Sequence, residues 1–460
     1  MSTQSWWCEQ AWVGDGPVAR VRIEADDGTI VAVTPNVDAQ PEDERLDGLV
    51  MPGLANAHSH AFHRALRGRT QGGGGTFWSW RTRMYALTSR LGPSSYLALA
   101  RAAYAEMALA GITAVGEFHY LHHGPYGVRY DDPNEMGLAL VQAAADAGVR
   151  LTLLDTCYLA GGLGVGGHLP LDGAQQRFGD GDADRWAARV EALRGQLASR
   201  QGEGPVDDVV VGTAVHSVRA VPRDELGAVR ASVERWRSGR SPVPLHVHLS
   251  EQPAENEACQ AYYGLTPTAL LHAEGLLGPE TTAVHATHLT ADDVTTLGSA
   301  STTACFCPTT ERDLADGIGP ARDLCDAGSA LALGSDQHAV VDLFEEARGL
   351  EAHERLRTLQ RGRFSPHQLV TAMTSSGHAS LGRPHAGRIA PGAPADLVAV
   401  RLDSARTAGS LPAQVVHSAT AADVHRVVVG GRTIVADGEH VLGDVGSLLR
   451  DAIEPLWQGR

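Results

Sequence analysis

Short apolar runs alternate with helix-forming stretches through the middle of the chain. Two of those stretches, YLALARAAYAEMALAG (96–111) and GLALVQAAADAG (137–148), end in glycine, which is typical of a helix C-terminus. Eight apolar runs have the length of buried strands: 49–57, 112–116, 151–154, 209–215, 245–249, 282–284, 302–306 and 331–334. Eight strand–helix repeats over roughly 340 residues predict an α/β fold, a (β/α)8 barrel with insertions.

A different pattern occupies both ends of the chain. Residues 18–33 and 425–438 each hold two β-branched runs joined by a turn, at Asp27-Gly28 and at Gly430-Gly431. Such pairs are typical of β-hairpins. The predicted domains are a small, discontinuous β-sandwich from residues 1–50 and 388–460 and, between its halves, the barrel at residues 51–387.

The charge balance excludes several kinds of partner. A net charge of −16 argues against binding to nucleic acid or to an anionic membrane surface. No run of about 18 apolar residues is long enough to span a bilayer, and the first residues, MSTQSWWCEQAW, lack the order of a secretory signal. Six scattered cysteines fit a reducing compartment. We therefore expect a cytoplasmic protein whose partner is a small molecule.

All 38 basic residues are arginine, and the chain has no lysine. Codon bias is the simplest cause, but the chemical consequence holds whatever the cause. The chain cannot form a Schiff base through lysine, cannot use a P-loop lysine and cannot bridge two metal ions with a carbamylated lysine.

Polar side chains follow the apolar runs at the ends that would form the mouth of the barrel. Positions i and i+2 of a strand share a face, so His58 and His60 can both point into that mouth. His248, His285 and Asp336 follow three other runs and would converge there. Each residue alone could be an ordinary polar group, but here polar residues at four different strand ends would all face the same mouth. Three imidazoles and a carboxylate are typical of catalytic zinc, so we predict one divalent ion per chain, with Zn²⁺ the expected metal.

Two alternatives stay open at the level of single residues. His246 shares a strand face with His248 and is a competing ligand. Cys305 and Cys307 could suggest a second metal, but a Cys-X-Cys pair at the end of a buried strand is more typical of a core. His338 lies near the site in sequence and receives no role.

These segments resemble the amidohydrolase superfamily over nearly the whole chain. The matching motifs are PGLANAHSH, HVHLSEQ, VHATH, GSD and PGAPADLVAV. Binuclear members bridge their metals with a lysine carbamate, so a chain without lysine resembles the mononuclear, deaminase-like branch. That branch implies four metal ligands, His58, His60, His248 and Asp336. It also implies that His285 and Asp336 orient the attacking water and that Glu251 carries protons. The family's His-X-X-Glu spacing favours His248 over His246 as the ligand.

A finer resemblance is to the formimidoylglutamate deiminases of histidine degradation, which convert N-formimidoyl-L-glutamate and water to N-formyl-L-glutamate and ammonia. It is carried by HSHAFHRALRG, FWSWRTRMY, GEFHYLHH, AVHSVRAV and CPTTERDLADG. The resemblance implies that Arg81, Tyr120 and Arg219 bind the carboxylates of this small dicarboxylate. It implies that His63, where family members often carry glutamine, and His216 contact the substrate near the formimidoyl group. A homodimer is expected.

Two other functions compete with this one. The chain could be a mononuclear deaminase acting on a purine, pterin or triazine ring, which an aromatic clamp with few arginines would favour. It could be a non-catalytic binding protein on the same scaffold, although such proteins usually lose metal ligands. At single positions, Arg81 could be a solvated helix-face arginine beside Arg83, and Tyr120 could be packed in a loop core. Arg219 comes only a few residues after its predicted strand. The case for a functional role is therefore stronger for Arg219 than for Arg81.

Overall fold

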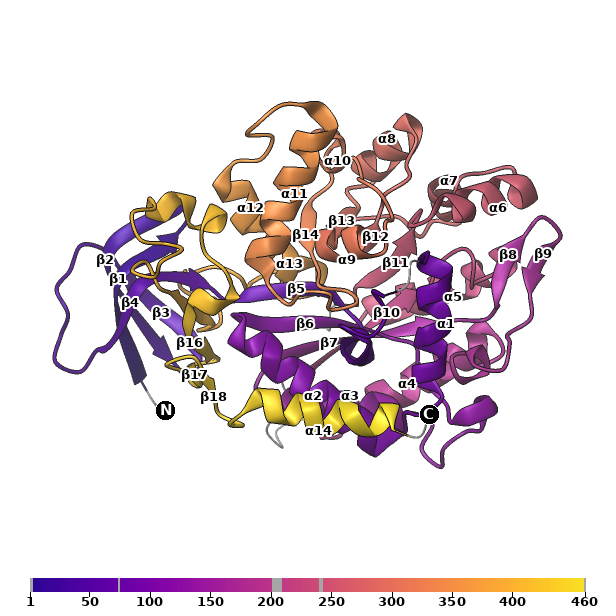
Figure 1. The fold of residues 1–460 in the computed structure, drawn as a ribbon, viewed down its shortest axis with the longest axis horizontal. Coiled ribbons are helices and arrows are strands. Elements are labelled where there is room, and N and C mark those ends of the chain that lie inside the picture. Colours follow the sequence, from indigo (N-terminus) through magenta and orange to yellow (C-terminus); the bar gives the residue numbers. More distant parts are fainter. Residues whose placement is uncertain (1–2, 73–74, 201–208, 240–242, 459–460) are drawn as a thin grey trace.

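Two eight-stranded sheets organise the protein, described here from a computed structural model (Figure 1). The structure describes residues 3–72, 75–200, 209–239 and 243–458. One of them, the barrel sheet, is parallel throughout, and its strands follow one another in chain order. They are β5 (Leu54–Ser59), β6 (Ile112–His119), β7 (Arg150–Cys157), β10 (Val209–Val215), β11 (Leu245–Leu249), β12 (Thr281–His285), β13 (Thr303–Phe306) and β14 (Leu331–Leu333). The predicted barrel is confirmed, because each of the eight apolar runs overlaps one of these strands.

The barrel closes between its first strand and the segment that follows its last. The Asp336 amide donates to the His58 carbonyl at 3.0 Å, and the His60 amide donates to the Asp336 carbonyl at 3.1 Å. Ser59 and Asp336 pair in an isolated parallel bridge. The seam of the barrel therefore brings together three residues that the sequence predicts as metal ligands.

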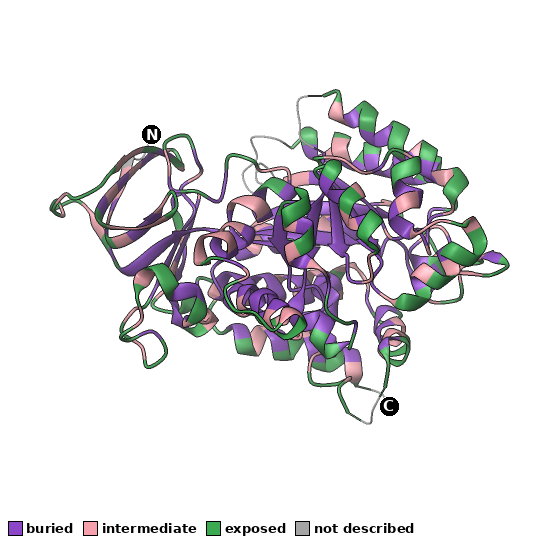
Figure 2. Cartoon of the chain, turned by 90° about the horizontal axis from the view of Figure 1, so that it is seen from above, coloured by how far each residue is buried: buried purple, intermediate pink, exposed green. Residues whose placement is uncertain are grey.

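Helices cover the outside of the barrel, with buried inner faces and exposed outer faces (Figure 2). Parallel strands covered in this way are buried on both faces, which explains why they appear as continuous apolar runs in the sequence. The helices are α1 (Phe77–Thr88), α2 (Pro93–Leu109), α3 (Glu135–Ala147), α4 (Ala183–Ala198), α5 (Arg223–Arg237), α6 (Pro253–Tyr263), α7 (Pro267–Ala273), α8 (Ala291–Ser299), α9 (Pro308–Asp313), α10 (Ala321–Ala327), α11 (Leu343–Thr358), α12 (Pro366–Met373) and α13 (Ser375–Ser380). Shorter elements are the hairpin β8 (Gly162–Gly164) and β9 (Gly167–Leu169) and the 3-10 turns η1 (Ala61–Leu66), η2 (Pro125–Gly127), η3 (Gln175–Arg177), η5 (Pro412–His417) and η6 (Ala421–Asp423).

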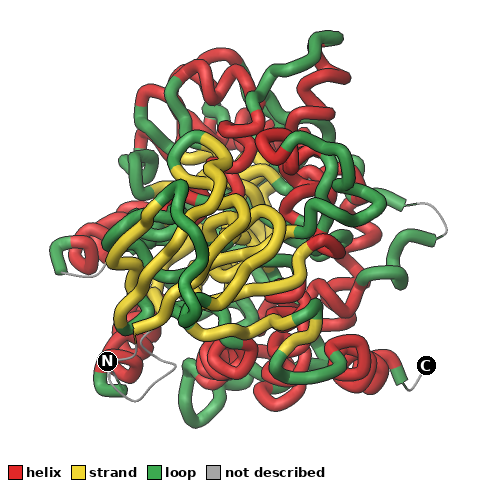
Figure 3. The backbone as a smooth tube through the Cα atoms, turned by 90° about the vertical axis from the view of Figure 1, so that its left-hand side faces the viewer, coloured by secondary structure: helices red, strands yellow, loops and turns green. Residues whose placement is uncertain are grey.

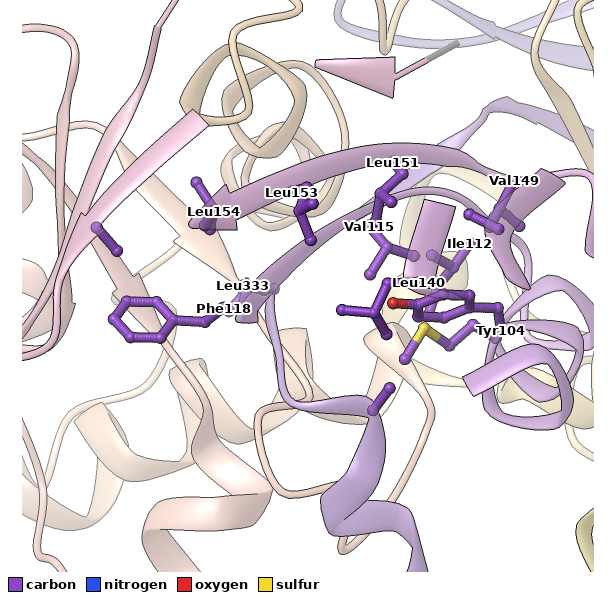
Figure 4. Packing of buried hydrophobic residues seen from close by; sticks show 14 of the residues in the cluster. Tyr104, Ile112, Val115, Phe118, Leu140, Val149, Leu151, Leu153, Leu154 and Leu333 are labelled. Atoms are coloured by element: carbon purple, nitrogen blue, oxygen red, sulfur yellow. The ribbon is translucent and has the colours of Figure 1, made fainter. Parts of the chain in front are cut away.

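The main apolar core lies between these helices and the outer faces of the strands (Figure 4). Tyr104 of α2 and Leu140 of α3 lie with Ile112 and Val115 of β6 in one buried cluster. Burial of one such aliphatic side chain contributes about 1.5–3 kcal/mol. The core thus fixes the strands, and the strand ends in turn fix the site.

The second eight-stranded sheet, which we call the terminal sheet, is built from both ends of the chain and lies at one end of the barrel (Figure 3). Its strand order is β18-β17-β16-β15-β4-β1-β2-β3. The bounds are β1 (Thr3–Val13), β2 (Gly16–Asp26), β3 (Thr29–Thr34), β4 (Glu44–Pro52), β15 (Leu397–Val400), β16 (Val424–Val429), β17 (Arg432–Ala436) and β18 (Glu439–His440). Side chains from both halves share a separate apolar core, so the β structure predicted from both termini is confirmed.

Both predicted hairpin turns are present, and they meet in space. Asp27 and Gly28 have φ of 48° and 73°, and Gly430 and Gly431 have φ of 54° and 77°. Two successive positive φ angles give a turn whose twist matches that of the flanking strands. A Cβ atom on Gly28 would lie 2.7 Å from the Gly430 carbonyl oxygen, so glycine is also required for the close approach of the two turns.

One predicted strand is divided in the structure. The apolar run 49–57 is split at Gly53, so that β4 belongs to the terminal sheet and β5 to the barrel sheet. The Gly53 amide donates to the Asp396 carbonyl at 2.8 Å, and a Cβ at this position would collide with the side chain of Thr113. No polar residue marks the split, because the two strands are buried on both sides of it.

The C-terminal helix α14 (Val445–Trp457) lies along α2 of the barrel rather than on the terminal sheet (Figure 1). The Trp457 indole donates to the Ala65 carbonyl at 3.1 Å. The domain boundaries at residues 50 and 388 stay predictions. None of the helices in the described part of the chain combines the length and the apolar character that crossing a membrane requires.

Candidate metal centre and active site

Several residues that follow the barrel strands have left-handed backbone conformations, which side chains other than glycine rarely adopt. They are Ser250 (φ 51°), His285 (φ 70°), Ala286 (φ 48°), Asp336 (φ 38°) and His338 (φ 59°). Such conformations cost free energy and gather at functional sites. Here they turn the chain at the mouth of the barrel, where the predicted site residues lie.

The four predicted metal ligands come together at this mouth, and all four are buried. The Nε2 atoms of His58 and His60 each lie 3.3 Å from Asp336 Oδ1. The Nε2 atom of His248 lies 3.2 Å from that of His58. We call these four residues the metal cluster. Their nitrogen and oxygen atoms face one small volume from β5, β11 and the turn after β14.

The chemistry of the metal cluster fits a divalent ion. His60 Nδ1 lies 2.9 Å from the Phe118 carbonyl, and a proton donated there leaves the Nε2 lone pair facing Asp336. Burial, together with the neighbouring histidines, lowers the pKa of His58 well below its usual value and that of His60 to about 3. Both imidazoles are therefore neutral, as metal ligation requires. Three neutral imidazoles and one carboxylate are a donor set typical of zinc.

The competing histidine on β11 points elsewhere. His246 Nε2 lies 2.8 Å from the Ser380 carbonyl oxygen. Burial lowers its pKa to about 4. His248, rather than His246, joins His58 and His60, in agreement with the His-X-X-Glu spacing.

The predicted proton carrier and the predicted water-orienting histidine are neighbours. Glu251 Oε1 lies 3.7 Å from His285 Nε2, and Glu251 Oε2 accepts a hydrogen bond of 3.0 Å from Arg219. Burial would lower the pKa of His285, but Glu251, Glu311 and Asp336 raise it to about 10. Glu311 was not singled out from the sequence, although it lies in CPTTERDLADG. Its Oε1 lies 3.6 Å from His285 Nδ1 and accepts from the Cys307 amide at 2.9 Å.

A cavity of about 310 Å³ opens above the metal cluster. All five residues predicted to bind substrate line it: His63, Arg81, Tyr120, His216 and Arg219. The Tyr120 hydroxyl lies 3.2 Å from His63 Nε2, so Tyr120 is a lining residue as well as a packed one. The remaining lining includes the aromatic side chains of Phe77, Trp80, Tyr85, Tyr158 and Phe178.

The two cavity arginines differ in their partners. Arg219 donates to Glu251, and its Nε lies 3.6 Å from Glu255 Oε2. Burial would lower the pKa of Arg219, but these two carboxylates raise it. Arg81 instead donates to the Tyr85 hydroxyl and, at 3.2 Å, to the Gly161 carbonyl. Among the described residues, Arg81 has no carboxylate within 4.0 Å.

This difference changes the weight of the two predictions. The sequence favoured a functional role for Arg219 over one for Arg81. In the described part of the chain, however, Arg81 is the cavity arginine whose charge no protein carboxylate matches. Arg81 is also not a solvated helix-face residue, since it lines the cavity while its neighbour Arg83 is exposed.

A hydrogen-bonded network lies behind the metal cluster and was not found from the sequence. Ser59 Oγ donates to Glu117 at 2.9 Å and lies 3.2 Å from His338 Nε2. The Ala61 amide also donates to Glu117, at 2.7 Å. Burial raises the pKa of Glu117 to about 8 despite these two donors. The network ties the turn after β5 to β6 and to the turn after β14, so it holds the strand ends that carry His58, His60 and Asp336.

The two cysteines of the Cys-X-Cys pair lie in the barrel interior. Cys305 and Cys307 are buried in a small apolar cluster with Ala57, Val284 and Ala332. Among the described residues, neither belongs to a group that could hold a metal ion. The interpretation as core residues is the one that the structure supports.

A second buried cluster of histidines and carboxylates lies at the ends of β6 and β7, outside the cavity. Asp155 receives two hydrogen bonds from Arg189, at 2.7 and 2.9 Å. Arg189 also donates to Asp180 at 2.9–3.0 Å, and His123 Nε2 lies 3.1 Å from Asp180. We call His122, His123, Asp155, Asp180 and Arg189 the arginine cluster.

The geometry of the site agrees with comparisons to known proteins. Residues 49–434 match the model of the amidohydrolase family. The chain is 34% identical to formimidoylglutamate deiminase of Pseudomonas aeruginosa, with 94% of this chain and 95% of that protein covered. It is 32% identical to 8-oxoguanine deaminase of the same organism, with 90% of each covered.

Solved structures show the same fold. An amidohydrolase from Brucella melitensis, 32% identical, aligns with a TM-score of 0.89 over 99% of this chain and all of that one. An adenosine deaminase from Xanthomonas campestris with bound zinc, 22% identical, aligns with a TM-score of 0.81 over 98% and 96%. The chain therefore belongs to the amidohydrolase family, as an enzyme related to that family's deaminases.

Proposed function

We propose that this enzyme hydrolyses N-formimidoyl-L-glutamate to N-formyl-L-glutamate and ammonia. The observation that carries the proposal is Arg81, a guanidinium that faces the cavity without a carboxylate partner among the described residues. A protein with a net charge of −16 repels a dianion unless its site supplies local positive charge. The deiminase relative, whose name describes this chemistry, supports the same substrate.

His58, His60, His248 and Asp336 would hold the metal ion. When bound, a zinc ion lowers the pKa of a water molecule towards about 7 and so makes hydroxide available at neutral pH. The remaining chemistry belongs to residues of this chain, namely Asp336, His285 and Glu251.

Glu251 is the proposed proton carrier. Asp336 and His285 orient the attacking water, whose oxygen forms a bond to the formimidoyl carbon while the π electrons of the C=N bond move to nitrogen. Glu251 takes a proton from the water and delivers it to that nitrogen. The hydroxyl of the resulting tetrahedral intermediate then gives its proton to Glu251, which delivers it to the same nitrogen. A lone pair of that oxygen forms the formyl C=O bond as the C–N bond breaks, and ammonia leaves with the electrons of the broken bond. Arg219 holds Glu251 by its hydrogen bond of 3.0 Å, which fixes the carboxylate near His285.

Substrate binding divides between the two arginines. Arg81 binds the side-chain carboxylate directly, since a planar guanidinium can donate two parallel hydrogen bonds to it. Arg219 faces the α-carboxylate while it is shared with Glu251 and Glu255. Burial raises the pKa of Glu255 to about 7 despite Arg219 beside it, so Glu255 can become neutral and leave Arg219 to the substrate. Tyr120 joins the two arginines in binding the carboxylates, and His63 and His216 complete the contacts near the formimidoyl group.

A ring deaminase is the second candidate, because aromatic side chains form much of the cavity wall. Phe77, Trp80 and Tyr158 could stack on a planar heterocycle. The 8-oxoguanine deaminase relative adds weight to this alternative. A neutral ring, however, would leave Arg81 without an anion to bind.

An ammonia-release assay separates the two candidates. The zinc-loaded enzyme should release ammonia from N-formimidoyl-L-glutamate and not from 8-oxoguanine or adenosine. Arg81→Met should raise KM by about 10²-fold, since losing a desolvated ion pair of about 3 kcal/mol corresponds to two powers of ten. Arg83→Met on the same helix is the matched control and should leave KM unchanged, because Arg83 is exposed and donates to the Arg69 carbonyl. Preference of the parent for a ring substrate would overturn the proposal.

A further inference from the structure

Gln175 is a buried polar residue that no step above uses. It lies on η3 and is 2% exposed. Its Oε1 accepts from the Asp172 amide at 3.1 Å, which fixes which end of the amide group is oxygen and which is nitrogen. The amide nitrogen therefore points in the opposite direction, towards the cavity wall.

Three acceptors surround that nitrogen. Gln175 Nε2 lies 3.0 Å from the Tyr85 hydroxyl, 2.9 Å from the Tyr158 hydroxyl and 2.9 Å from the Gly161 carbonyl. Tyr85 and Gly161 are also the two acceptors of Arg81. One side chain thus holds both groups that set the direction of the Arg81 guanidinium.

The network leaves the charge of Arg81 uncompensated. Burial and the neighbouring Tyr158 raise the pKa of Tyr85, so its hydroxyl stays neutral beside the guanidinium. Gln175 is neutral as well, whereas a carboxylate at the same place would attract Arg81 and cancel its charge. The wall is therefore built from neutral acceptors, which leave the charge of Arg81 available to a ligand.

We propose that Gln175 is a positioning residue that aims Arg81 and thereby sets the enzyme's selectivity for substrates with a second carboxylate. This inference rests on the proposed function. Gln175 acts only through Arg81 and does not touch the reacting atoms, so its removal should weaken binding and leave the chemical step intact. An interaction made equally in the ground state and the transition state changes KM and not kcat.

The test compares Gln175→Glu and Gln175→Met with the parent, each as zinc-loaded full chain. Gln175→Glu should raise KM for N-formimidoyl-L-glutamate by about 30-fold and Gln175→Met by about tenfold, with kcat within about threefold of the parent. Gln414→Glu adds the same negative charge at an exposed position and should change neither constant. For N-formimidoylglycine, which lacks the second carboxylate, all variants should behave like the parent.

A double-mutant cycle separates positioning from a merely structural role. In an Arg81→Met background, Gln175→Glu should change KM by less than about twofold, because the residue through which it acts is gone. The inference is overturned if both Gln175 variants keep the parental KM, or if their full effect persists without Arg81. Either result, with a parent that still hydrolyses N-formimidoyl-L-glutamate, leaves the proposed function standing. A parent that is inactive on this substrate overturns both.

Discussion

The metal cluster and the arginine cluster are both buried groups of histidines and carboxylates at barrel strand ends, and they differ in what faces the carboxylates. In the metal cluster, Asp336 faces two imidazole nitrogens at 3.3 Å. In the arginine cluster, Asp155 and Asp180 share the guanidinium of Arg189. His119, His122 and Asp155 even lie close enough together to resemble a metal site.

The orientation of the imidazoles separates the two clusters further. His122 Nε2 lies 3.0 Å from the Thr156 carbonyl and His123 Nε2 lies 3.1 Å from Asp180, so both nitrogens act as donors towards oxygen. Burial would lower the pKa of Arg189, but Asp155 and Asp180 raise it, so the guanidinium stays charged. A metal ion there would meet a fixed positive charge, and the two carboxylates are already compensated by Arg189. A group of histidines and carboxylates is therefore not sufficient for a metal site; the absence of a competing internal cation matters as much.

The largest expected effect comes from removing one member of the metal cluster. His248→Ala should reduce zinc from one ion per chain to nearly none, as measured by elemental analysis. Activity should fall by about 10⁴-fold or more, because a water molecule whose pKa stays near 15.7 instead of about 7 supplies little hydroxide. His246→Ala, on the same strand, is the matched control and should keep its zinc.

The arginine cluster provides the second control for this experiment. His122→Ala should also retain one zinc ion per chain. Two ions per chain in the parent, or loss of zinc from the His122 variant alone, would show that the two clusters are more alike than their geometry indicates.

Glu251→Gln should remove proton transfer without removing the metal. The amide oxygen can still accept from Arg219, so the geometry is preserved, and the expected loss is about 10²–10⁴ in kcat. Zinc content should match the parent. Glu255→Gln changes the other carboxyl that faces Arg219 and should cost less activity. A more damaging Glu255 variant would transfer the proton-carrying role to that residue.

The sequence was sufficient for the barrel and for the gathering of polar residues at its mouth, because both follow from short periodicities. The choice of four metal ligands among these residues came from the family resemblance. Strands buried on both faces appear as continuous apolar runs, and residues at i and i+2 share a face, which pairs His58 with His60. The missing lysine excluded a carbamate bridge without any structure. These inferences need only neighbours in the sequence.

Contacts between side chains of distant elements could not be predicted from the sequence. Gln175 reaches Tyr85 across 90 positions, and nothing in its own segment indicates this. The contrast between Arg81 and Arg219 depends on which carboxylates fold next to each guanidinium. The split of residues 49–57 at Gly53 was hidden because both resulting strands are buried, so hydrophobicity is the same on each side.

Arg189→Met tests whether the arginine cluster acts in stability rather than in catalysis. Removing the guanidinium leaves Asp155 and Asp180 buried without their cation, which should lower the free energy of unfolding by about 3–5 kcal/mol. Denaturant unfolding measures this change. Arg185→Met, on the same helix, loses only a surface pair with Asp182 and should cost less than about 1 kcal/mol. Folded Arg189→Met protein should retain one zinc ion, and loss of zinc from the folded variant would contradict the separation of the two clusters.

The smallest effect is expected from Trp186→Phe, which removes a single donor from the arginine cluster. The Trp186 indole donates to Asp155 Oδ1 at 3.1 Å, and the side chain is fully buried. Asp155 keeps both hydrogen bonds from Arg189, so its charge stays compensated and the loss should be about 1–2 kcal/mol, near the low end for a hydrogen bond to a charged group. Trp236→Phe is the matched control, because its indole donates to Glu191, an exposed residue that water can solvate instead. It should therefore cost less than Trp186→Phe in the same unfolding measurement. Both variants should keep kcat, KM and zinc content at parental values. If Trp186→Phe changes kcat or zinc content while its stability stays near the parent's, the arginine cluster is coupled to the metal cluster, and the division of roles between them is wrong.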